Sequence, residues 1–311
     1  MIFSNFAKKI AMKILTLIAA AVLPVIAMAY SNDRTPEDAI RAVVDKYPGE
    51  IGVAVITDNG DTVTVNDENK YPLMSVFKLH QAVALCIEAD RTGMSLDTTL
   101  CVARAELNPH TWSPMLREHT EDTLCLSVSR LLRYTLMESD NNASNLMFGS
   151  LTDVATTDSI IATLIQRNTF SLSYTEAEMG QEHSRAYANR SSPLGVACLI
   201  NRLFTDSIMS AGKQQFICRT LRECRTGKDR IAAPLVGVEG VAVAHKTGSG
   251  FRDGGILCAH NDAAFVELPD GRHYTLVVLV KDFPGYEHEA SQVIAEISAV
   301  LLSNRLSGGK P

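Results

Sequence analysis

The sequence has no surplus of basic residues and no basic run. It contains 29 lysine and arginine residues against 35 aspartate and glutamate residues, which gives a net charge of −6. Proteins that bind nucleic acids concentrate positive charge on one surface or along one helix. We therefore expect a partner that is not a nucleic acid.

The sequence also lacks the residue spacings of a metal site. Its seven cysteines include no C-x-x-C pair, and its eight histidines are scattered along the chain. Structural zinc sites use closely spaced cysteine and histidine ligands, so we expect no metal and no cofactor. Disulfides are allowed if the chain is exported, but an odd number of cysteines leaves at least one thiol unpaired in a monomer. The sequence leaves the pairing open.

Long apolar runs are also scarce, and the one that matters stands at the N-terminus. Three lysines precede the apolar residues 14–29, which end in the small-residue pattern Ala-Met-Ala. This arrangement is typical of a secretory signal peptide, and the run is shorter than the roughly 20 residues of a membrane span. We predict a signal peptide over residues 1–29, export to the periplasm and no membrane span after processing. An uncleaved membrane anchor is the alternative.

The rest of the chain shows no repeat, low-complexity tract or flexible linker, so it suits one large domain or two joined lobes. Asn59-Gly60 between two β-branched runs predicts a hairpin, strand patterns and a closing helix fill the C-terminal third, and the middle is mostly helical in pattern. We predict an α+β fold for a catalytic domain over residues 30–311. Both chain ends (about 30–74 and 227–311) would build an antiparallel sheet with flanking helices, with an all-helical lobe (about 75–226) inserted.

Three short polar motifs fall where these lobes would meet. Ser75 and Lys78 open a helix, Ser139-Asp140-Asn141 lies between two helical runs, and Lys246-Thr247-Gly248 ends a strand. Each has an ordinary explanation when taken alone: a capped helix with a solvated lysine, a helix cap, and a strand-to-turn junction. Their order, spacing and settings together indicate one catalytic site.

This motif set resembles that of the class A serine β-lactamases, which share it with penicillin-binding proteins. The resemblance extends from the hairpin to the closing helix. The segments SVFKLH and TEAEMGQEHSRAYANRSSPLG are most similar to the extended-spectrum, cephalosporin-hydrolysing CfxA-type branch. The resemblance implies a β-lactamase or transpeptidase-like fold, a small-molecule β-lactam substrate, and a monomeric hydrolase that confers antibiotic resistance.

Ser75 is the candidate nucleophile. A serine hydroxyl needs a positioned base, and residues i and i+3 share a helix face, so the amine of Lys78 can reach it. Desolvation and neighbouring cations lower the pKa of a lysine, which lets its amine accept a proton. The resemblance implies an acyl-enzyme on Ser75, with the backbone N–H groups of Ser75 and Ser249 donating to the carbonyl oxygen of the lactam.

The resemblance also implies how the other two motifs bind and protonate the substrate. Ser139 would pass a proton to the departing ring nitrogen, and Asn141 would hold the side-chain amide of the substrate. Lys246 would attract the substrate carboxylate and favour ionisation of Ser139. Thr247 and Ser249 would add hydroxyl groups to the carboxylate site.

A glutamate that activates the deacylating water distinguishes a class A lactamase from a penicillin-binding protein. Glu176 aligns with that glutamate, and Glu178 and Glu182 are nearby alternatives. The common pattern Glu-Pro-x-x-Asn is here Glu-Ala-Glu-Met-Gly, so Gly180 replaces the asparagine that helps to hold the water. A cis peptide bond after Glu176 would be costly, because the next residue is not proline. Asn189 is a candidate to complete the water site.

The carboxylate anchor departs from the common pattern too. Asn261 stands where the family often has an arginine, so Arg230 is the predicted substitute, because a guanidinium can bind a carboxylate through two N–H groups. A surface arginine is the alternative. Trp112 stands where the family has an aromatic ring at the cleft mouth, with a partly buried core tryptophan as the alternative. We expect His80 to be packed rather than catalytic.

We interpret the chain as a class A serine β-lactamase that is acylated on Ser75 and deacylated through Glu176, with cephalosporins and penicillins as substrates. Two other hypotheses remain. A D-alanyl-D-alanine peptidase or transpeptidase shares the first three motifs but would lack the dedicated glutamate. A penicillin sensor would be expected to carry a signalling domain and a membrane span.

Overall fold

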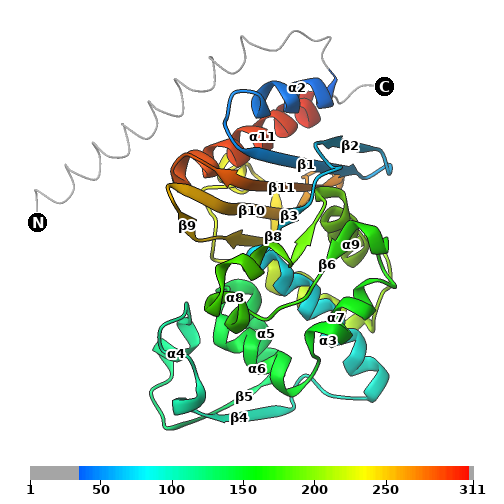
Figure 1. Cartoon of the computed structure of the whole chain (residues 1–311). Coiled ribbons are helices and arrows are strands. Elements are labelled where there is room, and N and C mark those ends of the chain that lie inside the picture. Colours follow the sequence, from blue (N-terminus) through cyan, green and yellow to red (C-terminus); the bar gives the residue numbers. More distant parts are fainter. Residues whose placement is uncertain (1–34, 308–311) are drawn as a thin grey trace, which may run out of the picture.

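The computed structural model describes residues 35–307, with helices on both sides of one central sheet (Figure 1). The predicted signal peptide, residues 1–29, lies outside the described residues. Within residues 35–307, none of the helices combines the length and the hydropathy that crossing a membrane requires.

The central sheet takes its strands from both ends of the chain, as the sequence predicted. They run antiparallel in the order β2-β1-β11-β10-β8, and β9 pairs with β10. The turn of the predicted hairpin contains Gly60 (φ 88°), and the turn between β10 and β11 contains Gly271 (φ 86°). Glycine adopts this left-handed conformation without steric cost. The strands are β1 (Glu50–Thr57), β2 (Thr62–Val65), β8 (Ala242–Ser249), β9 (Arg252–Asp253), β10 (Ile256–Glu267) and β11 (His273–Phe283).

Two helices from opposite chain ends cover one face of the sheet (Figure 1). They are α2 (Pro36–Val44) and α11 (Glu287–Ser307), and α11 is the predicted closing helix. Thr35 caps α2, since its hydroxyl accepts from the Asp38 N–H at 3.1 Å while the Asp38 carboxylate accepts from Thr35. Apolar side chains of both helices, such as Ile40 and Ile294, pack on sheet residues such as Val278.

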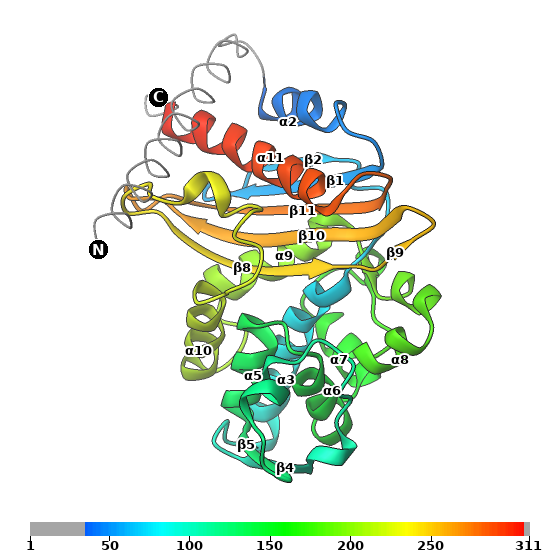
Figure 2. The ribbon, with the colours of Figure 1, turned by 90° about the vertical axis from the view of Figure 1, so that its left-hand side faces the viewer.

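The other face of the sheet lies on the helices of the middle segment (Figure 2). A single core joins Phe265 and Val277 of the sheet to Leu79 and Leu131 of these helices, so the lobe boundaries near residues 75 and 226 stay a prediction. The helices are α3 (Phe77–Thr92), α4 (Pro114–Glu118), α5 (Val128–Met137), α6 (Asn141–Ser150), α7 (Val154–Ile161), α8 (Glu176–Gln181), α9 (Pro193–Thr205) and α10 (Ala211–Arg222). Short 3₁₀ turns are η1 (Met74–Val76), η2 (Arg104–Glu106), η3 (Arg167–Thr169), η4 (His183–Tyr187) and η5 (Ala233–Leu235).

The structure also contains short strands that the sequence did not predict. β4 (Thr99–Ala103) and β5 (Thr123–Ser127) form a ribbon in which Cys101 lies opposite Cys125, and these two residues form a disulfide. A small sheet pairs β7 (Arg190–Ser191) with both β3 (Tyr71–Pro72) and β6 (Phe170–Ser171). The disulfide answers the pairing question that the sequence left open. The cysteines that remain free are Cys86, Cys198, Cys218, Cys224 and Cys258.

Candidate active site

Ser75 and Lys78 lie where η1 runs into α3. Lys78 Nζ is 3.1 Å from Ser75 Oγ, the contact that the i, i+3 spacing predicted. The Lys78 side chain is fully buried, and its ammonium donates to Ser139 O at 2.7 Å and to Asn141 Oδ1 at 2.6 Å. A buried ammonium is costly without such partners, so this lysine is held in place rather than solvated.

Glu176 reaches the same two groups from α8. Its Oε1 is 3.0 Å from Ser75 Oγ and 2.9 Å from Lys78 Nζ, and its side chain is 9% exposed. The hydroxyl of Ser75 therefore contacts a carboxylate and an amine at once. Both contacts lie within the distance at which a side chain can accept a proton as a general base.

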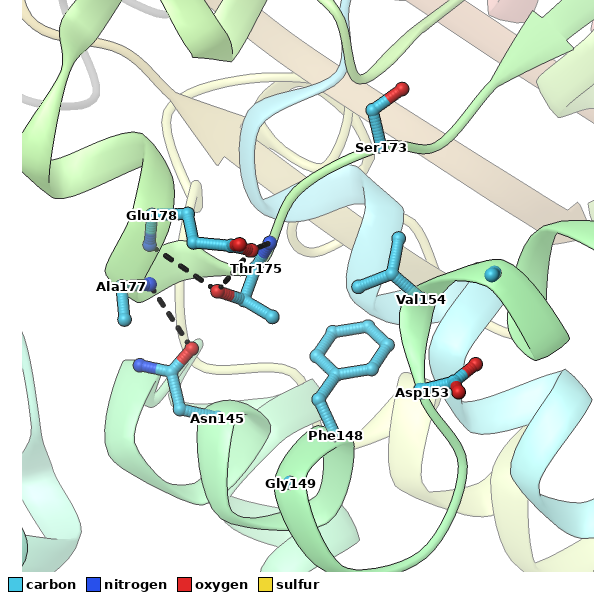
Figure 3. Close-up of a pocket in the computed structure, with 10 residues that line it drawn as sticks. Asn145, Phe148, Gly149, Asp153, Val154, Ser173, Thr175, Ala177 and Glu178 are labelled. Atoms are coloured by element: carbon cyan, nitrogen blue, oxygen red, sulfur yellow. Dashed lines mark hydrogen bonds between the residues drawn. The ribbon is translucent and has the colours of Figure 1, made fainter.

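A capping box between Thr175 and Glu178 fixes the first turn of α8, which begins at Glu176. Figure 3 shows the bonds of this capping box. The Thr175 hydroxyl accepts from the Glu178 N–H at 3.2 Å, and the Glu178 carboxylate accepts from the Thr175 N–H at 2.8 Å. These bonds to Thr175 hold the pKa of Glu178 below its usual range. Asn145 adds a bond from the Ala177 N–H at 3.1 Å. The Glu178 carboxylate is thus engaged by the cap, whereas Glu176 is the glutamate that contacts Ser75.

The pocket in Figure 3 lies behind this loop and not at the nucleophile. It has a volume of about 470 Å³, and its lining includes Asn145, Phe148 and Val154 but not Ser75 or Glu176. We therefore define the candidate site by its polar contacts.

Asn189, the candidate to complete the water site, has a different role in the structure. This side chain is fully buried, accepts from the N–H groups of Ser173 and Tyr174 at 2.7 and 3.0 Å, and donates to Tyr174 O at 2.7 Å. Its amide therefore stabilises the loop and is not available to hold a water beside Ser75.

Glu182, the other alternative to Glu176, pairs with Arg185 on the surface. The peptide bonds of the described residues are all trans.

Ser139, between α5 and α6, contacts both lysines of the site. It has a left-handed backbone (φ 60°), which is uncommon for a residue with a side chain. The next residue, Asp140, is buried and caps α6, accepting from the N–H groups of Ala143 at 2.8 Å and Met115 at 2.7 Å. Burial raises the pKa of Asp140. These bonds point the carbonyl of Ser139 at Lys78 and leave its hydroxyl for β8.

Lys246 of β8 meets that hydroxyl. Its Nζ donates to Ser139 Oγ at 3.0 Å and to Thr247 O at 2.8 Å, and the side chain is fully buried. Burial and the neighbouring charge of Lys78 lower the pKa of Lys246 to about 7. Lys246 can therefore gain or lose a proton near neutral pH, next to a hydroxyl that can carry one.

β8 approaches the nucleophile closely because of a glycine. A Cβ on Gly248 would lie 2.5 Å from Leu73 O, so a larger residue would push the strand away from η1. Asn261 holds the same segment: its amide donates to Pro72 O at 2.7 Å and to Leu73 O at 3.1 Å, and its oxygen accepts from the Val280 N–H at 3.1 Å. Asn261 positions the nucleophile rather than the substrate. Sequence reasoning missed this role, although an asparagine within a buried strand was a signal for it.

Arg230 takes the place expected for the carboxylate anchor. It is 6% exposed, so the surface-arginine alternative is wrong. Its Nη1 donates to Asn261 O at 2.6 Å and to Gly248 O at 3.2 Å, and its Nη2 donates to Ser249 Oγ at 2.5 Å. The hydroxyl of Thr247 lies 2.6 Å from that of Thr226. A guanidinium, an ammonium and two hydroxyl groups thus gather at the end of β8, which suits an anion.

Trp112 and Asn141 lie together at the other side of the site. The Asn141 N–H donates to Trp112 O at 3.0 Å. Trp112 is 52% exposed, so the core-tryptophan alternative is wrong, and its Nε1 donates to Glu138 O at 2.8 Å.

His80 is fully buried near Phe170, and burial lowers its pKa to about 4. It is therefore packed and neutral, as expected.

Comparison with known proteins agrees with this geometry. The sequence model of the β-lactamase enzyme family matches residues 35–304. A β-lactamase of Phocaeicola vulgatus is 56% identical over 267 residues, which are 86% of this chain and 83% of that protein. The extended-spectrum β-lactamase PER-1 of Pseudomonas aeruginosa is 29% identical over 263 residues, 84% of each chain. The crystal structure of a class A β-lactamase from Bacteroides cellulosilyticus has a TM-score of 0.82 and 29% identity, and the match covers 88% of this chain and 100% of that chain.

This chain therefore belongs to the β-lactamase enzyme family, and within it to the class A serine β-lactamases. These relatives are β-lactamases, and none of them supports the peptidase or sensor hypothesis.

Proposed function

We propose that this protein hydrolyses the amide bond of β-lactams through an acyl-enzyme on Ser75. The observation that carries the proposal is the triangle of Ser75, Lys78 and Glu176, whose three polar contacts are 2.9–3.1 Å long. A nucleophile with two bases in contact can be deprotonated for attack and can later direct a water at its own ester.

Acylation uses groups from both sides of the sheet–helix junction. Lys78 or Glu176 takes the proton of Ser75 as Oγ bonds to the carbonyl carbon of the lactam. The N–H groups of Ser75 and Ser249 donate to the oxygen that becomes negative. The ring C–N bond then breaks, and its nitrogen receives the proton of Ser139, which Lys246 replaces through the 3.0 Å contact.

Deacylation depends on Glu176. Its carboxylate takes a proton from a water, the resulting hydroxide attacks the ester carbon on Ser75, and the ester bond breaks to regenerate the serine hydroxyl. The capping box supports this role, because it directs the carboxylate of Glu176 to Ser75 and engages that of Glu178 elsewhere.

The substrate is held at two ends. Its carboxylate binds at Arg230, Lys246, Thr247 and Ser249, and its side-chain amide binds at Asn141, with Trp112 offering an exposed ring for stacking. Cephalosporins and penicillins both carry such a carboxylate. A broad substrate range is supported by the similarity to PER-1, which is named an extended-spectrum β-lactamase. A cephalosporin preference is supported by the resemblance of the segments SVFKLH and TEAEMGQEHSRAYANRSSPLG to the cephalosporin-hydrolysing branch.

The protein acts as a monomer that is exported to the periplasm. The lysine-flanked apolar run and the small residues before position 30 support the export part of this proposal. Cell fractionation combined with N-terminal sequencing of the processed protein tests it. A mature protein that begins near residue 30 in the periplasmic fraction is the expected result.

Turnover of a chromogenic cephalosporin by the purified protein tests the function. We expect many turnovers per molecule, and for Ser75→Ala neither turnover nor a covalent adduct by intact mass. Ser184→Ala is the matched control, because Ser184 is exposed and its hydroxyl donates to Glu182 on the surface. One stoichiometric burst from the unaltered protein would instead indicate a penicillin-binding protein or sensor, and labelling of Ser75→Ala would show that another residue is the nucleophile.

A further inference from the structure

The pocket in Figure 3, called the loop pocket below, is a cavity that the proposed mechanism does not use. One side comes from α6 and the start of α7, and the other comes from the segment that leads into α8. Its volume of about 470 Å³ lies within the range of about 300–1,000 Å³ that is typical of small-molecule sites. Gly149, Ser173 and Ala177 line the pocket and are exposed, so a ligand can enter it from solvent.

The loop pocket offers an apolar surface that is already in place. Phe148 of α6 is buried, and its ring stacks on that of Phe77 in α3, with centroids 5.8 Å apart and an angle of 8° between the ring planes. Figure 3 shows the Phe148 ring with Val154 on one side and Thr175 on the other. Because the stack fixes this ring, a ligand that packs on it need not order it first.

Gly149 keeps space open at the same place. Its φ is not positive, and a Cβ on it would meet nothing within 4 Å, so neither the backbone nor close packing requires a glycine here. Glycine is unfavourable within a helix relative to alanine. Gly149 shares a helix face with Asn145, four residues earlier, which accepts from Ala177 on the α8 side of the pocket. A side chain at position 149 would therefore take up room in the loop pocket.

The charges of the loop pocket are negative. Its lining contains the carboxylates of Asp153 and Glu178 and, among the described residues, no lysine, arginine or histidine. A bond from the Thr156 N–H holds the pKa of Asp153 below its usual range, and bonds from Thr175 do the same for the pKa of Glu178, so both are ionised at neutral pH. The pocket therefore suits a ligand that is both apolar and positively charged.

The loop pocket also adjoins the helix that carries Glu176. Its lining includes Thr175 and Ala177, the chain neighbours of Glu176. The Ala177 N–H donates to Asn145 Oδ1 at 3.1 Å, which ties the first turn of α8 to α6. A ligand that packs between Phe148 and this turn adds contacts to α8. Such a ligand stabilises the arrangement in which Glu176 contacts the nucleophile.

We propose that the loop pocket binds a small organic ammonium ion with an apolar body, and that binding restrains the first turn of α8. The apolar body packs on Phe148 and Val154, and Asp153 and Glu178 supply the negative charge that the ammonium needs. The importance of this restraint rests on the proposed function, which gives Glu176 its role. The binding itself does not depend on that function.

Phenethylammonium is a suitable probe, and phenethyl alcohol is its neutral analogue of similar shape. Titration of the full processed protein, followed by NMR signals of the probe, measures each Kd. We expect a Kd in the millimolar range for the ammonium and binding of the alcohol about 2- to 5-fold weaker, the contribution of a solvent-exposed ion pair. Asp153→Asn should reduce this difference while keeping the cap of α7, because asparagine caps helices about as well as aspartate.

A variant that fills the pocket tests where the probe binds. Gly149→Leu should weaken binding of phenethylammonium about 10-fold or more, because the leucine takes space that the ligand needs. Gly212→Leu is the matched control. Gly212 is an exposed glycine of α10 whose Cβ would also meet nothing within 4 Å, and its replacement should leave the Kd unchanged. Both changes introduce a better helix former, so we expect both proteins to fold.

Hydrogen exchange read by mass spectrometry tests the restraint of α8. The N–H groups of Ala177 and Glu178 are bonded at the pocket and exchange when this turn opens. If opening releases the ligand, exchange slows by the factor 1 + [L]/Kd. At a probe concentration of about nine times the Kd, we expect it to slow about 10-fold. The measurement uses no β-lactam, so its outcome is separate from that of the turnover test.

Four results would overturn the proposal. No binding of phenethylammonium would remove the site, and equal Kd values for the ammonium and the alcohol would remove the role of the carboxylates. Unchanged binding by Gly149→Leu would place the probe elsewhere on the protein. Unchanged exchange of Ala177 and Glu178 in the presence of bound probe would remove the link to α8.

Discussion

The role proposed for Glu176 can be tested by the smallest change that removes a base. Glu176→Gln keeps the size of the side chain, and the amide oxygen can still accept from Ser75 Oγ and Lys78 Nζ, which lie 3.0 and 2.9 Å from Glu176 Oε1. The glutamine side chain, however, cannot take a proton from water. Lys78 keeps its bonds to Ser139 O and Asn141 Oδ1 at 2.7 and 2.6 Å, so it stays beside Ser75 in the variant.

The size of the effect follows from the two steps that share this triangle. General-base assistance is worth about 10²–10⁴-fold, which corresponds to about 2.7–5.4 kcal/mol of activation free energy. Deacylation has Glu176 as the base in our mechanism and should slow by that factor. Acylation should slow less, because Lys78 also contacts Ser75 Oγ, at 3.1 Å. The acyl-enzyme on Ser75 should therefore accumulate.

Intact mass spectrometry of Glu176→Gln during turnover of a cephalosporin measures this accumulation, and the burst amplitude gives its rate of formation. Glu178→Gln is the matched control on the same helix. That change weakens a cap and should cost about 1 kcal/mol of stability while leaving turnover within a few-fold. Reversed behaviour of the two variants would show that the loop register is wrong. Normal deacylation in both would show that another group activates the water.

Two further substitutions separate substrate binding from positioning. Arg230→Ala should lower kcat/KM about 10- to 150-fold, the equivalent of a charge-assisted hydrogen bond of about 1.5–3 kcal/mol, and unchanged kinetics would leave the carboxylate to Lys246. Asn261→Ala should lower the free energy of unfolding in urea by about 1–3 kcal/mol for each buried backbone group left unpaired, and should lower kcat because Leu73 leads into the nucleophile. A full-activity Asn261→Ala protein of normal stability would contradict the positioning role.

Local signals predicted most of the fold. Asn59-Gly60 encodes its own turn, and the helix that follows Thr35 has a capping box in the sequence. The ribbon of β4 and β5 was missed because its strands are short and half exposed, and because its partners meet only in three dimensions. Helix α5 of the predicted helical middle begins only at Val128, where the Ser127 hydroxyl accepts from the Arg130 N–H at 3.2 Å. The residues before that cap are strand.

Some contacts of the candidate site were likewise predictable from local sequence, and others were not. The contact of Ser75 with Lys78 follows from helix geometry and was predictable from spacing alone. The contact between Lys246 and Ser139 joins residues 107 positions apart and was expected only from the family resemblance. The positioning role of Asn261 was missed, and Asn189 was expected at the water site rather than in bonds to the loop backbone. An amide within a buried strand or loop can bond to backbone or substrate equally well, and only the tertiary arrangement decides.

The low pKa of Lys246 makes a prediction about proton uptake on binding. In the free protein, burial and Lys78 lower that pKa to about 7, so at pH 8 most molecules hold a neutral Lys246. A substrate carboxylate beside it favours the ammonium form and raises the pKa again, so binding should take up a proton at pH 8. At pH 6 the amine is already charged in the free protein, and uptake should vanish.

Calorimetric titration of Ser75→Ala with a β-lactam, repeated in buffers of different ionisation enthalpy, measures this uptake without hydrolysis. The apparent binding enthalpy should depend on the buffer at pH 8, with a slope of up to about one proton, and be independent of it at pH 6. Ser75→Ala suits this test because Lys246 contacts Ser139 and Thr247 rather than Ser75. A buffer-independent enthalpy at pH 8 would show that Lys246 does not change protonation when the carboxylate binds. The charge that captures the substrate would then have to come from Arg230 alone.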